Sequence, residues 1–197
     1  ALRHFENPVH RVRDGFARGA VALGVSLNAL GHRDDRGNGA ANGERRLALF
    51  RRSALHLMGL LSNEASAHAC PDHLYALLTL VRRYRVKRVY LHLFTDGRDS
   101  PPHAGLKLLN ALMRVLKDEL IATVIGRFYA MDRKKDWTRT LLAYDAMVSG
   151  SGLSAASPQA AITESYNRNE SDEFIPPYVV RRRGHPVLSA GGQAERG

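Results

Sequence analysis

The chain has 197 residues, of which 44% are hydrophobic, and this is sufficient for one domain with a core of its own. Its apolar runs are too short to span a bilayer, its start lacks a signal-peptide pattern, and its single cysteine, Cys70, excludes an internal disulfide. These features argue against membrane-spanning and disulfide-stapled classes, and we expect a cytoplasmic protein with no membrane partner.

The net charge of +10 is concentrated at the two ends of the chain. Residues 1–52 and 181–197 carry 14 Lys and Arg against 6 Asp and Glu, whereas residues 53–180 carry 15 against 13. We interpret 1–52 as an atypical basic, flexible segment, 53–180 as the folded domain and 181–197 as a basic tail. A nucleic-acid-binding protein would carry its charge on a structured face, beside aromatic or groove-reading residues. We expect no nucleic-acid partner, and this charge count is the only feature that favours a basic nucleic-acid adaptor.

Short apolar runs alternate with helical patterns from Ser53 onward. Residues 54–61 form a nearly continuous apolar run, which is typical of a buried parallel strand. Pro71 and Asp72 then open a helix whose apolar residues recur at spacings of three and four. A second strand is predicted over 87–94, and a loop rich in Asp, Gly and Pro follows it.

The same alternation continues to about residue 166. A second helix runs to about Asp118, and a third strand covers 120–126. A third helix spans roughly 132–148, and a further short one is expected near 158–166. The inward side of the third helix is predicted to be Trp137, Leu141, Tyr144 and either Met147 or Val148. The pattern predicts an α/β fold, a parallel sheet sandwiched between helices on both faces and flanked by irregular basic ends.

Polar loops follow all three predicted strands. Because the carboxyl ends of parallel strands meet at one edge of a sheet, we expect these loops to converge. Their polar residues are Asn63, Glu64, His68, Asp72 and His73 in the first loop, Asp96, Arg98 and Asp99 in the second, and Arg127, Asp132 and Arg133 in the third. The three arginines offer planar charged groups suited to phosphate or carboxylate. The implied ligand is a small, multiply anionic, hydroxylated molecule such as a sugar-acid phosphate.

Two of these residues are candidates for acid–base chemistry. Asp99 could accept a proton from a substrate hydroxyl or orient it, and His68 could donate to a phosphoryl or carboxylate oxygen. Simpler interpretations stay open, since Arg98 and Asp99 could merely pair within a tight turn. Arg133 begins a charged stretch that resembles a solvated first helical turn.

Histidines elsewhere raise two further questions. His68, Cys70, Asp72 and His73 suggest a metal site, but their spacing matches no structural zinc pattern, and we expect no metal ligand in this chain. His56 and His92 lie inside predicted strands, where we interpret them as hydrogen-bonded core histidines.

Four segments, 55–62, 96–102, 126–133 and 171–175, occur in order and at suitable separations. Together they closely resemble the inserted substrate-binding domain of the cofactor-independent phosphoglycerate mutases, and the resemblance covers about residues 53–180. It implies an isomerase that interconverts 3- and 2-phosphoglycerate in glycolysis through a phosphoserine enzyme. It also implies a second domain, related to alkaline phosphatase, that holds two manganese ions and the serine.

The resemblance also implies roles for individual residues. Substrate would be bound by His68, Arg98, Asp99, Arg127 and Arg133, and His68 and Asp99 would take part in catalysis. The segment before His68 departs from the family pattern by one extra residue, and Cys70 stands where the family has a second histidine. Residues 1–52 show no nucleophilic-serine segment. The resemblance therefore implies that the chain supplies the glycerate-binding domain and is inactive alone, while a truncated domain that only binds a small anion is the alternative.

Overall fold

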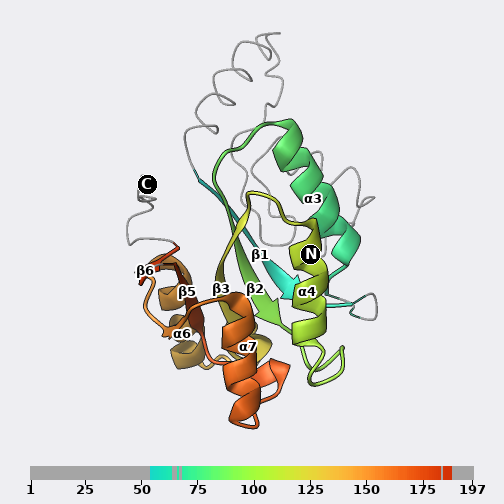
Figure 1. Cartoon of the computed structure of the whole chain (residues 1–197). Helices are drawn as coiled ribbons and strands as arrows, with labels where there is room; N and C mark the ends of the chain where they lie inside the picture. Colours follow the sequence, from blue (N-terminus) through green and yellow to red (C-terminus); the bar gives the residue numbers. More distant parts are fainter. Residues whose placement is uncertain (1–53, 64–65, 67, 183, 188–197) are drawn as a thin grey trace, which may run out of the picture.

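The computed structural model describes residues 54–63, 66, 68–182 and 184–187 (Figure 1). The predictions for residues 1–52 and for Glu64 therefore lie outside the described residues, as do those for most of 181–197. None of the described helices is both long enough and apolar enough to cross a membrane.

One sheet organises the described part of the chain. Its parallel part consists of β1 (Leu55–Leu61), β2 (Val89–Thr95) and β3 (Leu120–Gly126), which pair in that order. Next to β3 lies β5 (Tyr178–Arg182), which runs antiparallel to it, and β4 (Leu153–Ala155) pairs parallel to β5. A short β6 (His185–Pro186) adds an antiparallel pair, so regular strand structure extends past the expected boundary at residue 180.

Helices cover both faces of this sheet. On one face lie α3 (Pro71–Arg83), α4 (Gly105–Val115) and α7 (Pro158–Asn167), while α5 (Arg127–Ala130) and α6 (Trp137–Val148) lie on the other (Figure 1). The alternation of side chains along the strands explains this division, because Val124 packs in the first core and its neighbour Ile125 in the second. A 3₁₀ turn, η1 (Asp172–Phe174), precedes β5.

The three predicted strands, the α/β class and the helices at Pro71 and near 158–166 are confirmed. The sheet is mixed rather than wholly parallel, because β5 returns in the opposite direction. The interpretation of the two strand histidines is also confirmed. His56 Nδ1 lies 3.0 Å from His92 Nε2, and His92 Nδ1 lies 2.9 Å from Thr123 Oγ1.

The third helix differs from the prediction in its start and in its buried side. It begins at Trp137 rather than near 132, because the Asp136 side chain accepts a hydrogen bond from the Thr138 N–H and caps the helix. Ala143 and Ala146 face the sheet, with Met147 partly buried beside them. The large residues expected inside are exposed instead, at 75% for Trp137 and 54% each for Leu141, Tyr144 and Val148.

Candidate functional site

Asp96 follows β2 directly and is the anchor of the loop after this strand. Its carboxylate accepts hydrogen bonds from the N–H groups of Asp99 and Ser100, at 3.2 and 3.1 Å. It also accepts one from Ser62 Oγ, at 3.2 Å, since the pairing of Leu61 with Thr95 brings the ends of β1 and β2 together. The loop is therefore wound around a buried carboxylate.

Arg127 joins the end of β3 to this loop. The sheet register pairs Thr95 with Gly126, so the residues that follow these two strands, Asp96 and Arg127, are neighbours. The Arg127 side chain is only 6% exposed, and its Nη1 donates to Asp96 Oδ1 and, at 3.1 Å, to Asp99 Oδ2. One guanidinium thus holds two carboxylates.

The electrostatics of this pair follow from burial and from hydrogen bonding. Burial by itself would raise the pKa of Asp96, but hydrogen bonds from Arg127 and from the Asp99 N–H, together with the charge of Arg127, lower that pKa. Burial by itself would lower the pKa of Arg127, and the hydrogen bonds and charges of Asp96 and Asp99 raise it. Asp96 and Arg127 therefore both carry their charges at neutral pH.

Asp99 is the point where the loops meet. Its Oδ2 accepts from Arg127 and, at 3.2 Å, from Ser66 Oγ, and His68 Nε2 lies 3.9 Å away. The Asp99 side chain remains 28% exposed. The structure therefore brings His68, Asp99 and Arg127 together, with one face of the Asp99 carboxylate open to solvent.

The Arg98 side chain points outward from the same loop, and its partner, Glu173, lies on another segment of the chain. Its Nη1 lies 3.6 Å from Glu173 Oε1, while 56% of the Arg98 side chain is exposed. The turn η1 that carries Glu173 packs directly on the loop, and Thr95 Oγ1 donates to the Asp172 carbonyl at 2.7 Å. Gly97, at φ +66°, leaves room for this contact, since a Cβ there would stand 2.6 Å from the Glu173 nitrogen.

Asp172 fixes η1 through its side chain. Its carboxylate accepts hydrogen bonds from the Gly105 N–H at 2.7 Å and from Tyr166 Oη at 2.6 Å, and it is buried. Burial raises the pKa of Asp172 more than these hydrogen bonds lower it. Neither Asp172 nor Glu173 was predicted as a site residue, because Thr95, Arg98 and Gly105, which they contact, lie about 70 residues away in the chain.

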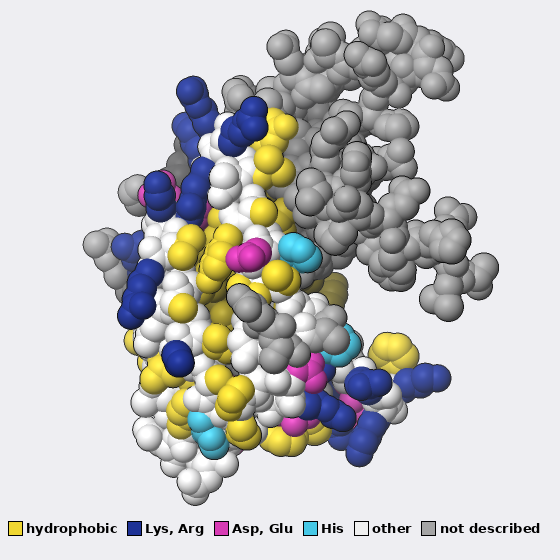
Figure 2. Space-filling model, turned by 90° about the vertical axis from the view of Figure 1, so that its right-hand side faces the viewer, with side chains coloured by type: hydrophobic (Ala, Val, Ile, Leu, Met, Phe, Trp, Pro, Cys, Tyr) yellow, Lys and Arg dark blue, Asp and Glu magenta, His cyan; other side chains and the backbone are white. Residues whose placement is uncertain are grey.

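Arg133 lies apart from these contacts. It is exposed in the loop between α5 and α6, and among the described side chains it takes no part in the ion pairs around Arg127. Its neighbour Asp132 is structural, since it accepts hydrogen bonds from the Asp136 N–H at 2.7 Å and from Arg139 at 3.2 Å. On the face shown in Figure 2, basic, acidic and His side chains are mixed at one lower corner rather than forming a uniform basic surface.

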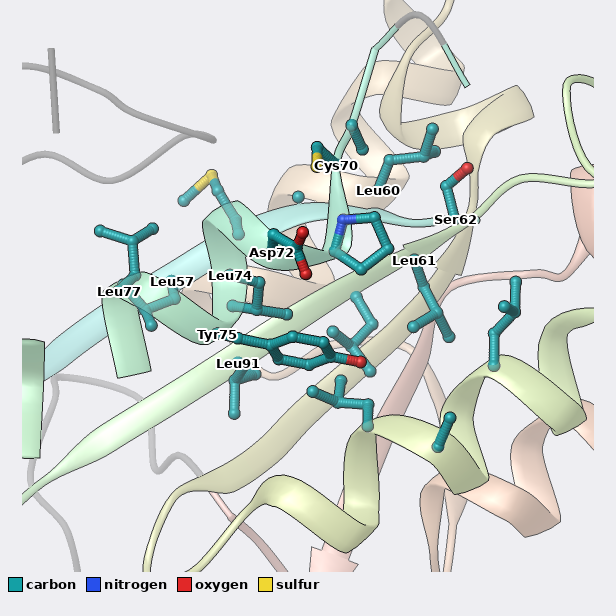
Figure 3. A pocket seen from close by; sticks show the side chains of 18 of the residues that line it. Leu57, Leu60, Leu61, Ser62, Cys70, Asp72, Leu74, Tyr75, Leu77 and Leu91 are labelled. Atoms are coloured by element: carbon teal, nitrogen blue, oxygen red, sulfur yellow. The ribbon is translucent and has the colours of Figure 1, made fainter. Parts of the chain in front are cut away.

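An apolar cavity of about 500 Å³ lies beside this site, between β1, α3 and α4. Figure 3 shows Ser62 and Cys70 at one end of the cavity, with leucine side chains and Tyr75 along its walls. Asn63 and Asp72 line this cavity rather than the Arg127 network. Among the described residues there is no group of three or more His, Cys, Asp or Glu side chains placed to hold a metal ion, so these residues do not fit a metal.

Comparisons with known proteins identify the family. The family model described as BPG-independent PGAM N-terminus matches residues 45–191. The chain belongs to this family. It is 46% identical over 155 residues to the 2,3-bisphosphoglycerate-independent phosphoglycerate mutase of Moorella thermoacetica, covering 77% of this chain and 30% of that protein. Identity to the corresponding mutase of Chloroflexus aurantiacus is 51% over 143 residues, covering 71% and 26%.

A solved structure supports the same assignment for the fold. The phosphoglycerate mutase of Leishmania mexicana, in crystals at low cobalt concentration, is similar with a TM-score of 0.67 and 27% identity, over 75% of this chain and 29% of that one. The chain therefore spans less than a third of the length of these three relatives.

Proposed function

We propose that this chain binds 3-phosphoglycerate and 2-phosphoglycerate as the glycerate-binding part of a cofactor-independent phosphoglycerate mutase. The observation that carries the proposal is the half-open Asp99 carboxylate, which is contacted by His68 and Arg127 from two other loops and lies next to the exposed Arg98. This combination suits a hydroxylated, multiply anionic ligand, with cations for its charged groups and an oriented carboxylate for its hydroxyls.

The contacts suggest a division of roles among the five residues. Arg98 and Arg133 are exposed and have guanidinium groups available for phosphate or carboxylate. Arg127 fixes the Asp99 carboxylate by a contact of 3.1 Å, so Asp99 is oriented to accept a hydrogen bond or a proton from a substrate hydroxyl. His68 is half exposed and its Nε2 lies 3.9 Å from Asp99, so it can donate to a substrate oxygen.

The rest of the mutase reaction would come from outside the described residues. We assign the nucleophilic serine and the two manganese ions to the remainder of the protein, in an alkaline-phosphatase-like domain. There, the metals would assist transfer of the phosphoryl group. The chain would be inactive alone, and the complete enzyme would serve glycolysis in the cytoplasm.

Isothermal titration of the purified chain tests the binding proposal. We expect heat of binding with 3-phosphoglycerate and with 2-phosphoglycerate, and affinity at least about tenfold weaker for inorganic phosphate or glycerate, each of which carries one half of the ligand's groups. Equal affinity for phosphate and 3-phosphoglycerate would reduce the function to that of a general anion-binding domain. Measurable interconversion of the two phosphoglycerates by the chain alone would contradict the assignment of serine and metals to a separate part.

A further inference from the structure

The α6 helix has an apolar stripe that faces away from the sheet. Trp137, Leu141, Tyr144 and Val148 follow one another at spacings of four, three and four, so they form a single line along the helix. All four are at least half exposed. We call these four residues the α6 stripe.

The orientation of α6 is fixed by its opposite side. Ala143 and Ala146 lie against the second core, where their small side chains let the helix approach Ile125 and Val179 closely. The helix start is fixed as well, because Arg139 pairs with both Asp132 and Asp136 and lies 4.0 Å above the Phe128 ring. The α6 stripe is therefore held outward by packing and by ion pairs on other sides of the helix.

An outward stripe of this size is unusual for a free surface. Large apolar side chains normally line the buried side of an amphipathic helix, and contiguous exposed ones mark interaction sites.

The position of the α6 stripe connects it to the candidate site. Trp137 lies four residues after Arg133, and the Phe128 ring of the adjoining α5 lies 5.0 Å from the ring of Phe174, the neighbour of Glu173. A protein surface that covers Trp137 would therefore lie close to Arg133. The exposed Arg133, Lys134 and Lys135 at this end of α6 would meet acidic side chains on such a surface.

We propose that the α6 stripe is the surface on which the remainder of the mutase docks, through an apolar patch edged with carboxylates. The inference rests on the proposed function, which requires groups from that remainder at the rim of the site. The relatives indicate what would cover the stripe, because this chain spans only 26% to 30% of the Chloroflexus and Moorella mutases and the rest of their length is available to pack on it. A second copy of this chain would cover the stripe without bringing the missing groups.

Hydroxyl-radical footprinting read by mass spectrometry tests this assignment, since Trp, Tyr and Met side chains oxidise at rates set by their exposure. The chain alone is compared with a chimera in which it replaces the matching 30% of the Moorella thermoacetica mutase. We expect Trp137 and Tyr144 to oxidise at least about threefold more slowly in the chimera. Met113, 39% exposed on α4 at the other face, is the internal control and should keep its rate.

A paired variant sharpens the result. Leu141→Glu in the chimera places a charge in the stripe and should restore fast oxidation of Trp137, whereas Met113→Glu should not. If the chimera fails to fold, the chain is labelled with 5-fluorotryptophan and mixed with the Moorella polypeptide that lacks the segment. Trp137 is the only tryptophan, so a single ¹⁹F resonance should shift on mixing.

Three results would overturn the docking surface. The first is equal oxidation of Trp137 in chain and chimera, and the second is a ¹⁹F resonance that does not move on mixing. The third is protection that rises with the concentration of the chain alone, which assigns the stripe to a second copy. These outcomes are separate from the proposed function, because titration of the isolated chain with 3-phosphoglycerate tests that function without any partner.

Discussion

At each end of the parallel strands an arginine pairs with a buried carboxylate, and the two ends differ in what remains open to solvent. At the amino edge of β3, Arg82 binds both oxygens of Glu119 at 2.6 and 2.9 Å, and the Lys117 N–H adds a hydrogen bond to Oε2 at 2.8 Å. The Glu119 side chain is 4% exposed. At the carboxyl edge, Arg127 binds Asp96 and Asp99, and Asp99 stays open to solvent.

The difference separates a structural pair from a candidate site. A buried carboxylate whose oxygens are all bonded has no capacity left for a ligand, and its pair only ties two elements together. The loops at the carboxyl edge leave an oriented carboxylate with spare capacity, and exposed cations flank it. Parallel strands favour this arrangement at the carboxyl edge, where loops from neighbouring strands converge.

The largest expected effect comes from truncating the arginine of each pair. Arg127→Ala leaves Asp96 without its cation and should lower the free energy of unfolding by about 3–5 kcal/mol in urea titrations. It should also abolish 3-phosphoglycerate binding. Arg82→Ala, the matched control at the other edge, should destabilise the protein by a smaller amount because Arg82 is partly exposed, and should leave the affinity unchanged.

If either the Arg127→Ala or the Arg82→Ala prediction fails, the interpretation of the site changes. Weaker binding in Arg82→Ala would mean that loss of stability alone disturbs the site. If Arg127→Ala is too unstable to purify, Arg127→Lys keeps the charge but loses the fork that bridges two carboxylates, and it should still bind at least tenfold more weakly.

His56 and His92 lie within the sheet, away from both ends of its strands, and burial lowers the pKa of each. Burial, followed by the charge of His56, lowers the pKa of His92 to about 4, while the unfolded chain titrates near 6.5. The unfolded state therefore takes up a proton first, and stability that is complete above pH 6.5 is lost as the pH falls towards 4. The expected loss is roughly 3 kcal/mol.

His92→Gln removes this titration while leaving groups that can bond His56 and Thr123. Urea titrations at several pH values should therefore give a shallower fall in stability between pH 6.5 and 4 than in the unaltered protein. Binding of 3-phosphoglycerate at pH 7.5 should be unaffected. An unchanged slope would mean that His92 is not protonated preferentially on unfolding.

Substitution of the exposed Arg98 should weaken ligand binding without destabilising the fold, unlike substitution of the buried Arg127. Arg98→Ala removes a charge-assisted contact worth about 1.5–3 kcal/mol, so the affinity for 3-phosphoglycerate should fall at least tenfold. Its free energy of unfolding should change by no more than about 0.5 kcal/mol, because Arg98 is exposed. Arg114→Ala, an exposed arginine on α4, is the control and should change neither quantity.

Much of this arrangement could be predicted from the sequence, because it depends on local patterns. The apolar runs at 54–61, 87–94 and 120–126 gave β1, β2 and β3 within two residues, and the rule for parallel strands placed their loops at one edge. The bond between Arg127 and Asp96 could not be predicted, since it requires the register that pairs Thr95 with Gly126. Glu173 was missed for the same reason, because it reaches Arg98 from far along the chain.

The buried side of α6 shows a different limit. A helical period tells which residues share a side, but not which side meets the sheet. Hydrophobicity predicted that the side with the large residues at 137, 141, 144 and 148 would be buried. In the structure the side with Ala143 and Ala146 packs on the sheet instead. The prediction was wrong because burial of large side chains and close approach of the helix to the sheet favour opposite sides of α6. If another part of a longer protein covers the α6 stripe, the large side chains are buried there, and hydrophobicity and close packing no longer conflict.

The smallest expected effect belongs to Arg133, which is exposed and is not among the described residues that pair with Arg127. Arg133→Ala should weaken 3-phosphoglycerate binding by about three- to tenfold, because an exposed cation that lacks fixed partners loses side-chain freedom when it binds. Lys134→Ala, which removes an equally exposed neighbouring charge, is the matched control and should weaken binding less than twofold. Equal losses in the two variants would show that this loop contributes only a general positive field, and the specific contacts would then be confined to Arg98, Asp99 and Arg127.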